Sequence, residues 1–135
     1  MRNNKSWVCL ILCLLLFLQV AVINVEAEGI QPRYTYISAF GATLTTNSSK
    51  TMLTISADLQ ASVLSTVVLR CYIQCYEDGY WRDLHGWYEN GSKVISLDAT
   101  YEAVPNYTYR LLVRGFVYNS DGTLIDSENI YQYVS

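Results

Sequence analysis

Alternating apolar and polar side chains in residues 66–77, TVVLRCYIQCYE, constrain the fold of this chain more than any other feature. Successive side chains of a β-strand point to opposite faces, so a two-residue period indicates a strand with one buried face. The residues predicted to face the core are Val67, Leu69, Cys71, Ile73 and Cys75. The residues predicted on the opposite face are Arg70, Tyr72, Gln74 and Tyr76.

Segments of this kind recur along the chain, and turn-forming residues separate them about every 8 to 15 residues, as in a sandwich or barrel. Seven strands are predicted, over residues 34–45, 51–60, 66–77, 80–88, 93–101, 106–118 and 123–133. Residues that tolerate positive φ predict four turns, at 47–50, 77–79, 89–92 and 119–122. We therefore expect an all-β domain.

Two further strands indicate which side faces the core. In the second strand the apolar side carries Leu53, Ile55, Ala57 and Leu59. In the sixth strand one side carries Tyr109, Leu111, Val113, Gly115 and Val117, and the other carries Arg110, Leu112, Arg114, Phe116 and Tyr118. This pattern predicts two antiparallel sheets, each with one core face and one solvent-facing side.

Residues 1–27 have the order of a secretory signal peptide. Two basic residues precede an apolar run over 7–18, and Val25 and Ala27 then have the small side chains of a cleavage site. Cleavage after Ala27 would leave one domain, residues 28–135. The alternative is an uncleaved anchor, since the apolar residues up to Val25 approach the about 20 that span a bilayer.

Size and charge narrow the classes of partner. Removal of residues 1–27 leaves 108 residues and changes the formal net charge from −3 to −4. A domain of this length can bury a stable core without disulfides or metal ions to support it. An acidic domain is not expected to bind nucleic acid. We expect a secreted, extracellular protein that keeps no stable membrane span after cleavage.

Two cysteines remain in the predicted mature chain, Cys71 and Cys75. On one strand they would lie about 13 Å apart, because each step along a strand covers about 3.3 Å. A disulfide needs Cα atoms within about 7 Å, so we expect two buried free thiols. No histidine or cysteine cluster completes a metal site, and no cofactor is expected.

Catalytic signatures are missing from the sequence. The single histidine, His85, lies two residues from Asp83 and could share a strand face with it, although such a pair is more often simply solvated. There is no serine elbow, no H-E-x-x-H and no glycine-rich phosphate loop. We therefore do not expect an enzyme.

Several short motifs carry a resemblance to a known family. They are Ala42-Thr43-Leu44, Ile73-Gln74, Gly79-Tyr80-Trp81 and the Tyr/Arg-rich stretch from Tyr107 to Arg114. The chain resembles a family of small secreted proteins of Gram-positive bacteria known only as a domain of unknown function. The resemblance implies secretion and transfers no activity.

The stretch Tyr107-Thr108-Tyr109-Arg110-Leu111 is also similar to a strand of fibronectin type III and immunoglobulin-like domains. In those domains a tyrosine hydroxyl ties a corner to nearby backbone, and Tyr109 would be that tyrosine. The inter-sheet cysteine pair of true immunoglobulin domains is missing. The resemblance implies a seven-stranded antiparallel immunoglobulin-like β-sandwich, and the order of residues 1–27 predicts a cleavable signal-peptide helix before it.

The aromatic excess suggests a binding surface. Aromatic residues make up 13% of the chain and include 12 tyrosines, more than one small core can hide. Tyrosine and arginine together are typical of contact surfaces. The predicted binding residues are Arg70, Tyr72, Tyr76, Arg110, Arg114, Phe116, Tyr118 and Trp81. The leading hypothesis is a non-catalytic interaction module that contacts an extracellular protein.

Three alternatives stay open. The aromatic residues could form cross-strand pairs that stabilise an exposed sheet and need no partner. A carbohydrate-binding domain would use Trp81, Tyr88 or Tyr76 as a stacking platform, although Trp81 and Trp87, six residues apart on one strand, are expected to share a side and belong to the core. A small secreted toxin or antimicrobial protein is the third, which the acidic charge disfavours.

Overall fold

The computed structural model describes residues 35–134, which form seven β-strands. The strands are β1 (Ile37–Thr46), β2 (Met52–Ala61), β3 (Thr66–Glu77), β4 (Tyr80–Ser92), β5 (Val94–Glu102), β6 (Tyr109–Tyr118) and β7 (Leu124–Tyr133). All seven predicted strands are confirmed, with most bounds shifted by a few residues. The predicted signal peptide lies outside the described residues. In the described part of the chain, no helix has the length and apolarity needed to cross a membrane.

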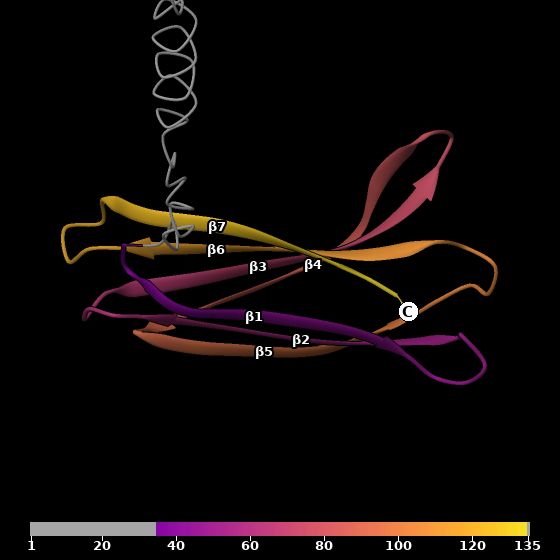
Figure 1. Ribbon diagram of the computed structural model, residues 1–135, viewed down its shortest axis with the longest axis horizontal. Helices are drawn as coiled ribbons and strands as arrows, with labels where there is room; N and C mark the ends of the chain where they lie inside the picture. The colour runs from indigo at the N-terminus through magenta and orange to yellow at the C-terminus, as the bar shows by residue number, and fades with distance from the viewer. Residues whose placement is uncertain (1–34, 135) are drawn as a thin grey trace, which may run out of the picture. The chain divides into compact units, whose positions relative to one another are not determined.

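The strands form two antiparallel sheets that lie as two layers (Figure 1). One sheet has the order β1-β2-β5, and the other has the order β4-β3-β6-β7. Consecutive strands therefore change sheets at the β2–β3, β4–β5 and β5–β6 connections. The predicted arrangement of two antiparallel sheets is confirmed.

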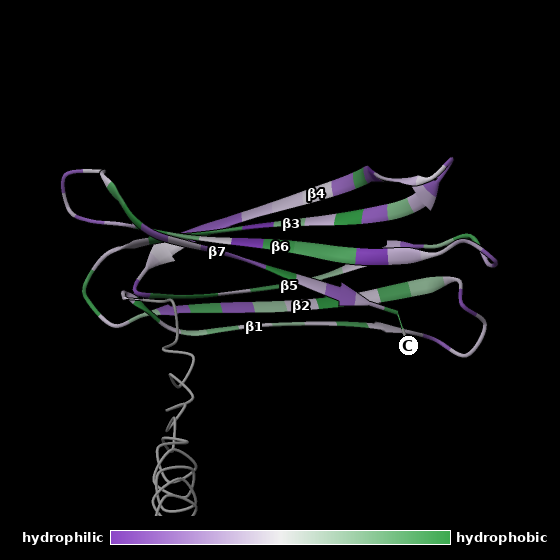
Figure 2. Cartoon of the chain, turned by 45° about the horizontal axis from the view of Figure 1, so that its top comes forward, coloured by the Kyte–Doolittle hydropathy of each residue, from purple (hydrophilic) through white to green (hydrophobic). Residues whose placement is uncertain are grey.

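The core lies between the inner faces of the two sheets. The predicted inward residues of β2, β3 and β6 are all buried, and the alternation that places them shows as alternating green and purple along β2 in Figure 2. Gly115 on β6 brings the sheets close together, because a Cβ there would lie 3.1 Å from Phe40 Cζ and 3.2 Å from Leu59 Cδ2. Close packing of β1 and β2 onto β6 thus depends on glycine, which has no side chain, at position 115.

Three of the four predicted turns are confirmed. Lys50 has φ of 57° in the β1–β2 turn, and Gly122 has φ of 85° in the β6–β7 turn. Asp78 and Gly79, with φ of 53° and 88°, form the two-residue turn between β3 and β4. Positive φ at both central residues suits the right-handed twist of the flanking strands.

The turn predicted at residues 89–92 is wrong, because β4 continues to Ser92. Asn90 and Gly91 pair with β3 and do not reverse the chain. Gly91 is needed for packing, since a Cβ there would lie 2.4 Å from Ile95 Cγ2. The change of direction comes one residue after β4, at Lys93.

Lys93 passes the chain from the four-stranded to the three-stranded sheet. Its φ is 65°, its N–H donates to Ser65 O at 2.9 Å, and its carbonyl accepts from Ala61 N–H at 2.8 Å. A single residue therefore connects β4 to β5 and is hydrogen-bonded to the segment that leads from β2 to β3.

A β-bulge in the β3–β4 pair changes which side chains share a face. Ile73 pairs with His85 and Gln74 pairs with Asp83, so Leu84 is an extra residue on β4. Such a bulge bends the strand, and in Figure 1 the hairpin end of β3 and β4 bends away from the three-stranded sheet. The expectation that Asp83 and His85 share a face is wrong for this reason.

The two tryptophans of β4 are separated by the same bulge. Trp87 pairs with Cys71 and packs against the core, whereas Trp81 pairs with Tyr76 on the outer face. The prediction that both tryptophans lie on one side is therefore wrong. It assumed an unbroken two-residue period, and Leu84 interrupts that period.

Two hydrogen-bonded anchors hold strand ends. The Tyr109 hydroxyl accepts from Val104 N–H at 2.9 Å and donates to Val104 O at 3.4 Å, which confirms the predicted tie to the corner before β6. Asp126 Oδ2 on β7 accepts from the N–H groups of three successive residues, Thr35, Tyr36 and Ile37, at 3.1, 2.8 and 3.1 Å. The second anchor fixes the start of β1 against β7.

Candidate functional site

The outer side of the four-stranded sheet carries all eight residues predicted to bind a partner. β3 contributes Arg70, Tyr72 and Tyr76, β4 contributes Trp81, and β6 contributes Arg110, Arg114, Phe116 and Tyr118. The same side also holds Gln74, Asp83, Tyr88, Leu112, Tyr131 and Tyr133. We call this set of fourteen residues the Tyr/Arg face.

Arg110 is held at one end of the Tyr/Arg face. Its Cζ lies 4.3 Å from the centroid of the Trp81 ring and 4.7 Å from that of Tyr131, within the range of cation–π contacts. Its Nε donates to Gln74 Oε1 at 2.6 Å, and Gln74 Nε2 donates to Asp83 Oδ1 at 2.6 Å. The guanidinium charge is therefore linked to a carboxylate through one buried amide.

Aromatic rings surround this network. The centroids of Tyr76 and Trp81 lie 5.2 Å apart, and those of Trp81 and Tyr133 lie 5.9 Å apart. The Tyr133 hydroxyl accepts a long hydrogen bond of 3.5 Å from Arg110 Nη1. Because Tyr76 and Tyr133 are 48% and 56% exposed, about half of each side chain still faces solvent.

Arg70 and Arg114 lie opposite each other on β3 and β6. Arg70 Cζ is 5.3 Å from the ring centroid of Phe116 and 5.9 Å from that of Tyr88, and Arg114 Cζ is 5.8 Å from that of Tyr72. Both arginines are exposed. Among residues 35–134, neither guanidinium has a carboxylate partner within 4.0 Å or a hydrogen-bond acceptor.

Three residues on this outer side of the sheet are buried. Leu112 is only 3% exposed, and Val68 and Gln74 are also buried, although all three point away from the core between the sheets. Gln74 is hydrogen-bonded between Arg110 and Asp83 on this side. This outer side still faces solvent as expected, since Arg70 and Arg114 are exposed and Tyr88 is 56% exposed.

The outer side of the three-stranded sheet differs in chemistry. Its middle strand presents Thr54, Ser56 and Asp58, and the adjoining β5 presents Asp98 and Thr100. Short polar side chains and carboxylates dominate there, with no arginine. The two outer sides of the protein thus have opposite charge.

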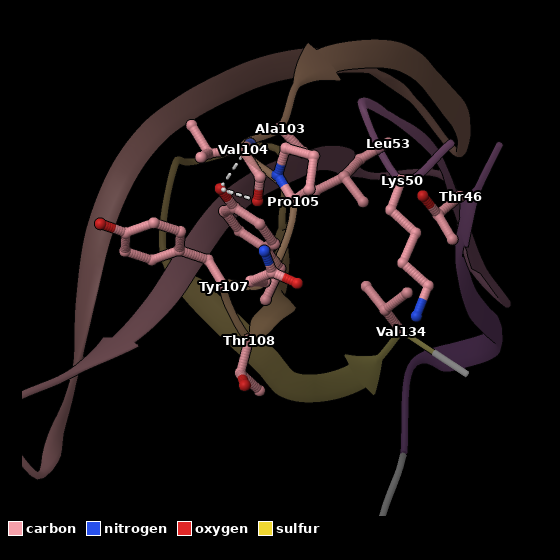
Figure 3. Close-up of a pocket in the computed structure, with 11 residues that line it drawn as sticks. Thr46, Lys50, Leu53, Ala103, Val104, Pro105, Tyr107, Thr108 and Val134 are labelled. Carbon is pink, nitrogen blue, oxygen red and sulfur yellow. Dashed lines mark hydrogen bonds between the residues drawn. The ribbon is translucent and has the colours of Figure 1, made fainter. Parts of the chain in front are cut away.

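A pocket of about 180 Å³ lies at the end of the sandwich near Tyr109 (Figure 3). Lys50 and Val134 line one side of it, and Val104 and Thr108 line the other. The dashed lines in Figure 3 mark the hydrogen bonds at Val104. The hydroxyl of Tyr109, one of the lining residues, is thus already used to hold the chain.

Groups with reactive chemistry are dispersed or shielded. His85 stacks edge-on against Trp87 at 4.6 Å. Cys71 and Cys75 are free and buried, as predicted, and burial raises the pKa of Cys71 to about 11 and also raises the pKa of Cys75. Within residues 35–134, no three His, Cys, Asp or Glu side chains gather to hold a metal ion.

The network of Gln74 and Asp83 was missed by the sequence reasoning. Alternation places Gln74 on the outer face, but the bulge at Leu84 hides that Asp83 lies there too. No signal in the sequence marks the bulge. No protein-family model matches this chain, and no curated protein matches it significantly.

Proposed function

We propose that this protein is a secreted, non-catalytic interaction module that contacts a partner protein through the Tyr/Arg face. The observation that carries the proposal is the concentration of three arginines and eight aromatic side chains on one outer sheet face. Tyrosine, tryptophan and arginine are the residues that most often dominate the binding energy of protein interfaces. The chain as a whole has a formal net charge of −3, so this arginine-rich face differs from it in charge.

The side chains of the face are held in place before any partner arrives. Each arginine lies over at least one ring, and Arg110 is also hydrogen-bonded to Gln74. Ordering a long side chain on binding costs about 0.5–1.5 kcal/mol, so preordered arginines reduce that cost. The half-exposed rings of Tyr88 and Tyr131 supply apolar area beside them.

The competing explanation is that these residues only stabilise the sheet. Cross-strand aromatic pairs contribute about 0.2–1 kcal/mol each without a partner, but like charges directly opposite each other destabilise a sheet. Arg70 and Arg114 occupy such a position. A face selected only for stability has no need of two arginines there, which favours binding.

The proposal includes an immunoglobulin-like fold. The first, second and fifth strands lie in one sheet and the third, sixth and seventh lie in the other, a grouping shared with immunoglobulin constant domains, whereas the fourth strand pairs here with the third and not with the fifth. The Tyr109 hydroxyl bonded to Val104 adds the corner typical of the class. Secretion through residues 1–27 belongs to the same proposal.

Sugar stacking receives less support from the geometry. Arg110 lies 4.3 Å over the Trp81 ring and occupies one of its faces. The planes of Tyr76 and Tyr133 are inclined to that of Trp81 by 55° and 70°, so these rings offer no common platform. Protein contact remains the proposed function.

Two matched double variants test the proposal. Tyr88→Ser/Tyr131→Ser removes two half-exposed tyrosines from the face, and Tyr80→Ser/Tyr107→Ser removes two half-exposed tyrosines elsewhere. The mature protein and both variants, each with its fold checked by circular dichroism, would be applied to arrays of extracellular proteins and glycans. We expect the first variant alone to lose binding to a protein. Equal binding by both variants, or binding to glycans only, would contradict the proposal.

A further inference from the structure

We propose that Arg70 and Arg114 together bind carboxylate groups of the partner, which therefore presents an acidic protein segment. The inference rests on the proposed function and names the chemistry that the Tyr/Arg face recognises. It concerns the centre of the face, between β3 and β6, and excludes Arg110, whose Nε is already bonded to Gln74.

The charge of the Arg70 and Arg114 pair is unmatched within the described residues. Arg70 and Arg114 are direct cross-strand partners, and both are exposed. The nearest carboxylates by register, Glu89 and Glu128, pair with the core-facing positions Leu69 and Gly115 and so lie on the opposite side of the sheet. Asp83, which shares the outer side with the arginines, accepts from Gln74. Within the described residues, no acidic group compensates the two charges, and an anion from outside would do so.

Aromatic rings position the two guanidinium groups. Phe116 and Tyr88 flank Arg70, and Tyr72 flanks Arg114. A guanidinium that lies over a ring keeps its planar N–H donors free for an acceptor in front of it. Stacking thus fixes the position of the pair while leaving its hydrogen-bonding capacity unused.

Carboxylate is the acceptor that this arrangement suits best in a protein partner. The planar fork of arginine bonds a carboxylate through two parallel N–H···O bonds. Half-exposed Tyr88 and Tyr131 stand on the strands at either side, β4 and β7. Such rings can pack on the neighbouring apolar atoms of a peptide and exclude water from the charged contact.

The acidic peptide acetyl-Glu-Glu-Glu-Glu-amide serves as the probe, and its all-glutamine counterpart serves as the neutral control. Binding would be followed by isothermal titration at low salt and by the Nε–Hε resonances of Arg70 and Arg114. The test variant is Arg70→Gln/Arg114→Gln. The matched variant is Arg82→Gln/Lys93→Gln, which removes the same charge from exposed positions outside the face.

We expect the affinity for the glutamate peptide to fall by at least about tenfold in the test variant, since charge-assisted hydrogen bonds contribute about 1.5–3 kcal/mol. The matched variant should stay within about twofold of the wild type, because it loses only diffuse attraction. Arg114→Lys keeps the charge without the planar fork and should show an intermediate loss.

Three results would overturn the inference. They are equal peptide affinity in the two double variants, no binding of the glutamate peptide to the wild type, and binding of a sulfated oligosaccharide in its place. Failure here is distinct from failure of the proposed function. If Tyr88→Ser/Tyr131→Ser abolishes protein binding while Arg70→Gln/Arg114→Gln keeps it, the face is a binding site but the acidic ligand is wrong.

Discussion

Tyr109→Phe removes one hydroxyl and with it both hydrogen bonds to Val104. Tyr109 is 7% exposed, so the ring stays in the core and only the polar tie is lost. A typical hydrogen bond contributes about 0.5–1.5 kcal/mol, and a buried donor left without a partner costs about 1–3 kcal/mol. Because the side chain of Val104 is exposed, water reaches this corner, and we expect a loss of about 1–2 kcal/mol.

Thermal unfolding of the mature protein measures this loss. For a domain of this size, about 1 kcal/mol lowers Tm by roughly 4–8 °C, so a decrease of roughly 5–15 °C is expected. Tyr107→Phe is the control, because this tyrosine lies in the same connection, is half exposed and has no hydroxyl partner within residues 35–134. If Tyr109→Phe lowered Tm no more than Tyr107→Phe, the corner bond would not hold the domain together.

Three further perturbations test the anchors and the core. Asp126→Ala leaves three backbone N–H groups without their carboxylate, and we expect a loss of about 2 kcal/mol in urea denaturation, with faster amide exchange at Tyr36. Gly91→Ala forces a methyl group against Ile95 and should cost about 1–3 kcal/mol, seen as a lower urea midpoint at unchanged slope. Burial raises the pKa of the Cys71 thiol from 9.0 to about 11, so the folded state holds this proton more tightly than the unfolded chain. Its stabilising contribution is complete below about pH 9 and is lost as the pH rises through about 11, by about 3 kcal/mol; Cys71→Ala should show a correspondingly smaller alkaline decrease in the free energy of unfolding.

Alternation predicted the inner faces of β2, β3 and β6 because these strands carry a long apolar period that only one register can bury. Turns were predictable where positive φ is required, as at Gly79 and Gly122. Tyr109 could be assigned because its position near the start of the sixth strand matches a known corner. These features depend on neighbours in sequence.

The bulge in β4 and its continuation to Ser92 could not be predicted, because tertiary packing overrides the local sequence preferences of this strand. β4 is an edge strand with no buried residue, so it shows no strong period that would reveal the extra residue Leu84. Asn90-Gly91 has the composition of a hairpin turn, yet Gly91 is needed for the close approach of Ile95. The sequence does not distinguish a glycine that forms a turn from one, such as Gly91, that allows a neighbouring side chain to pack closely.

The pairing of Arg70 with Arg114 was also beyond sequence reasoning, since it depends on the register between strands far apart in the chain. A shift by two residues would keep every side chain on its face and separate the arginines. The core fixes the register, but it does not require arginine at either exposed position. Arg114→Glu should therefore replace repulsion by attraction and leave the free protein as stable or more stable, by up to about 1 kcal/mol.

The same Arg114→Glu change should abolish binding of the glutamate peptide, because a carboxylate would then occupy the site and repel the ligand. Stability and binding are thus expected to move in opposite directions, as is common where a surface has been shaped by function. Urea denaturation and peptide titration on the same sample would measure both. A variant that lost stability and kept its affinity would show that these arginines support the sheet and bind nothing.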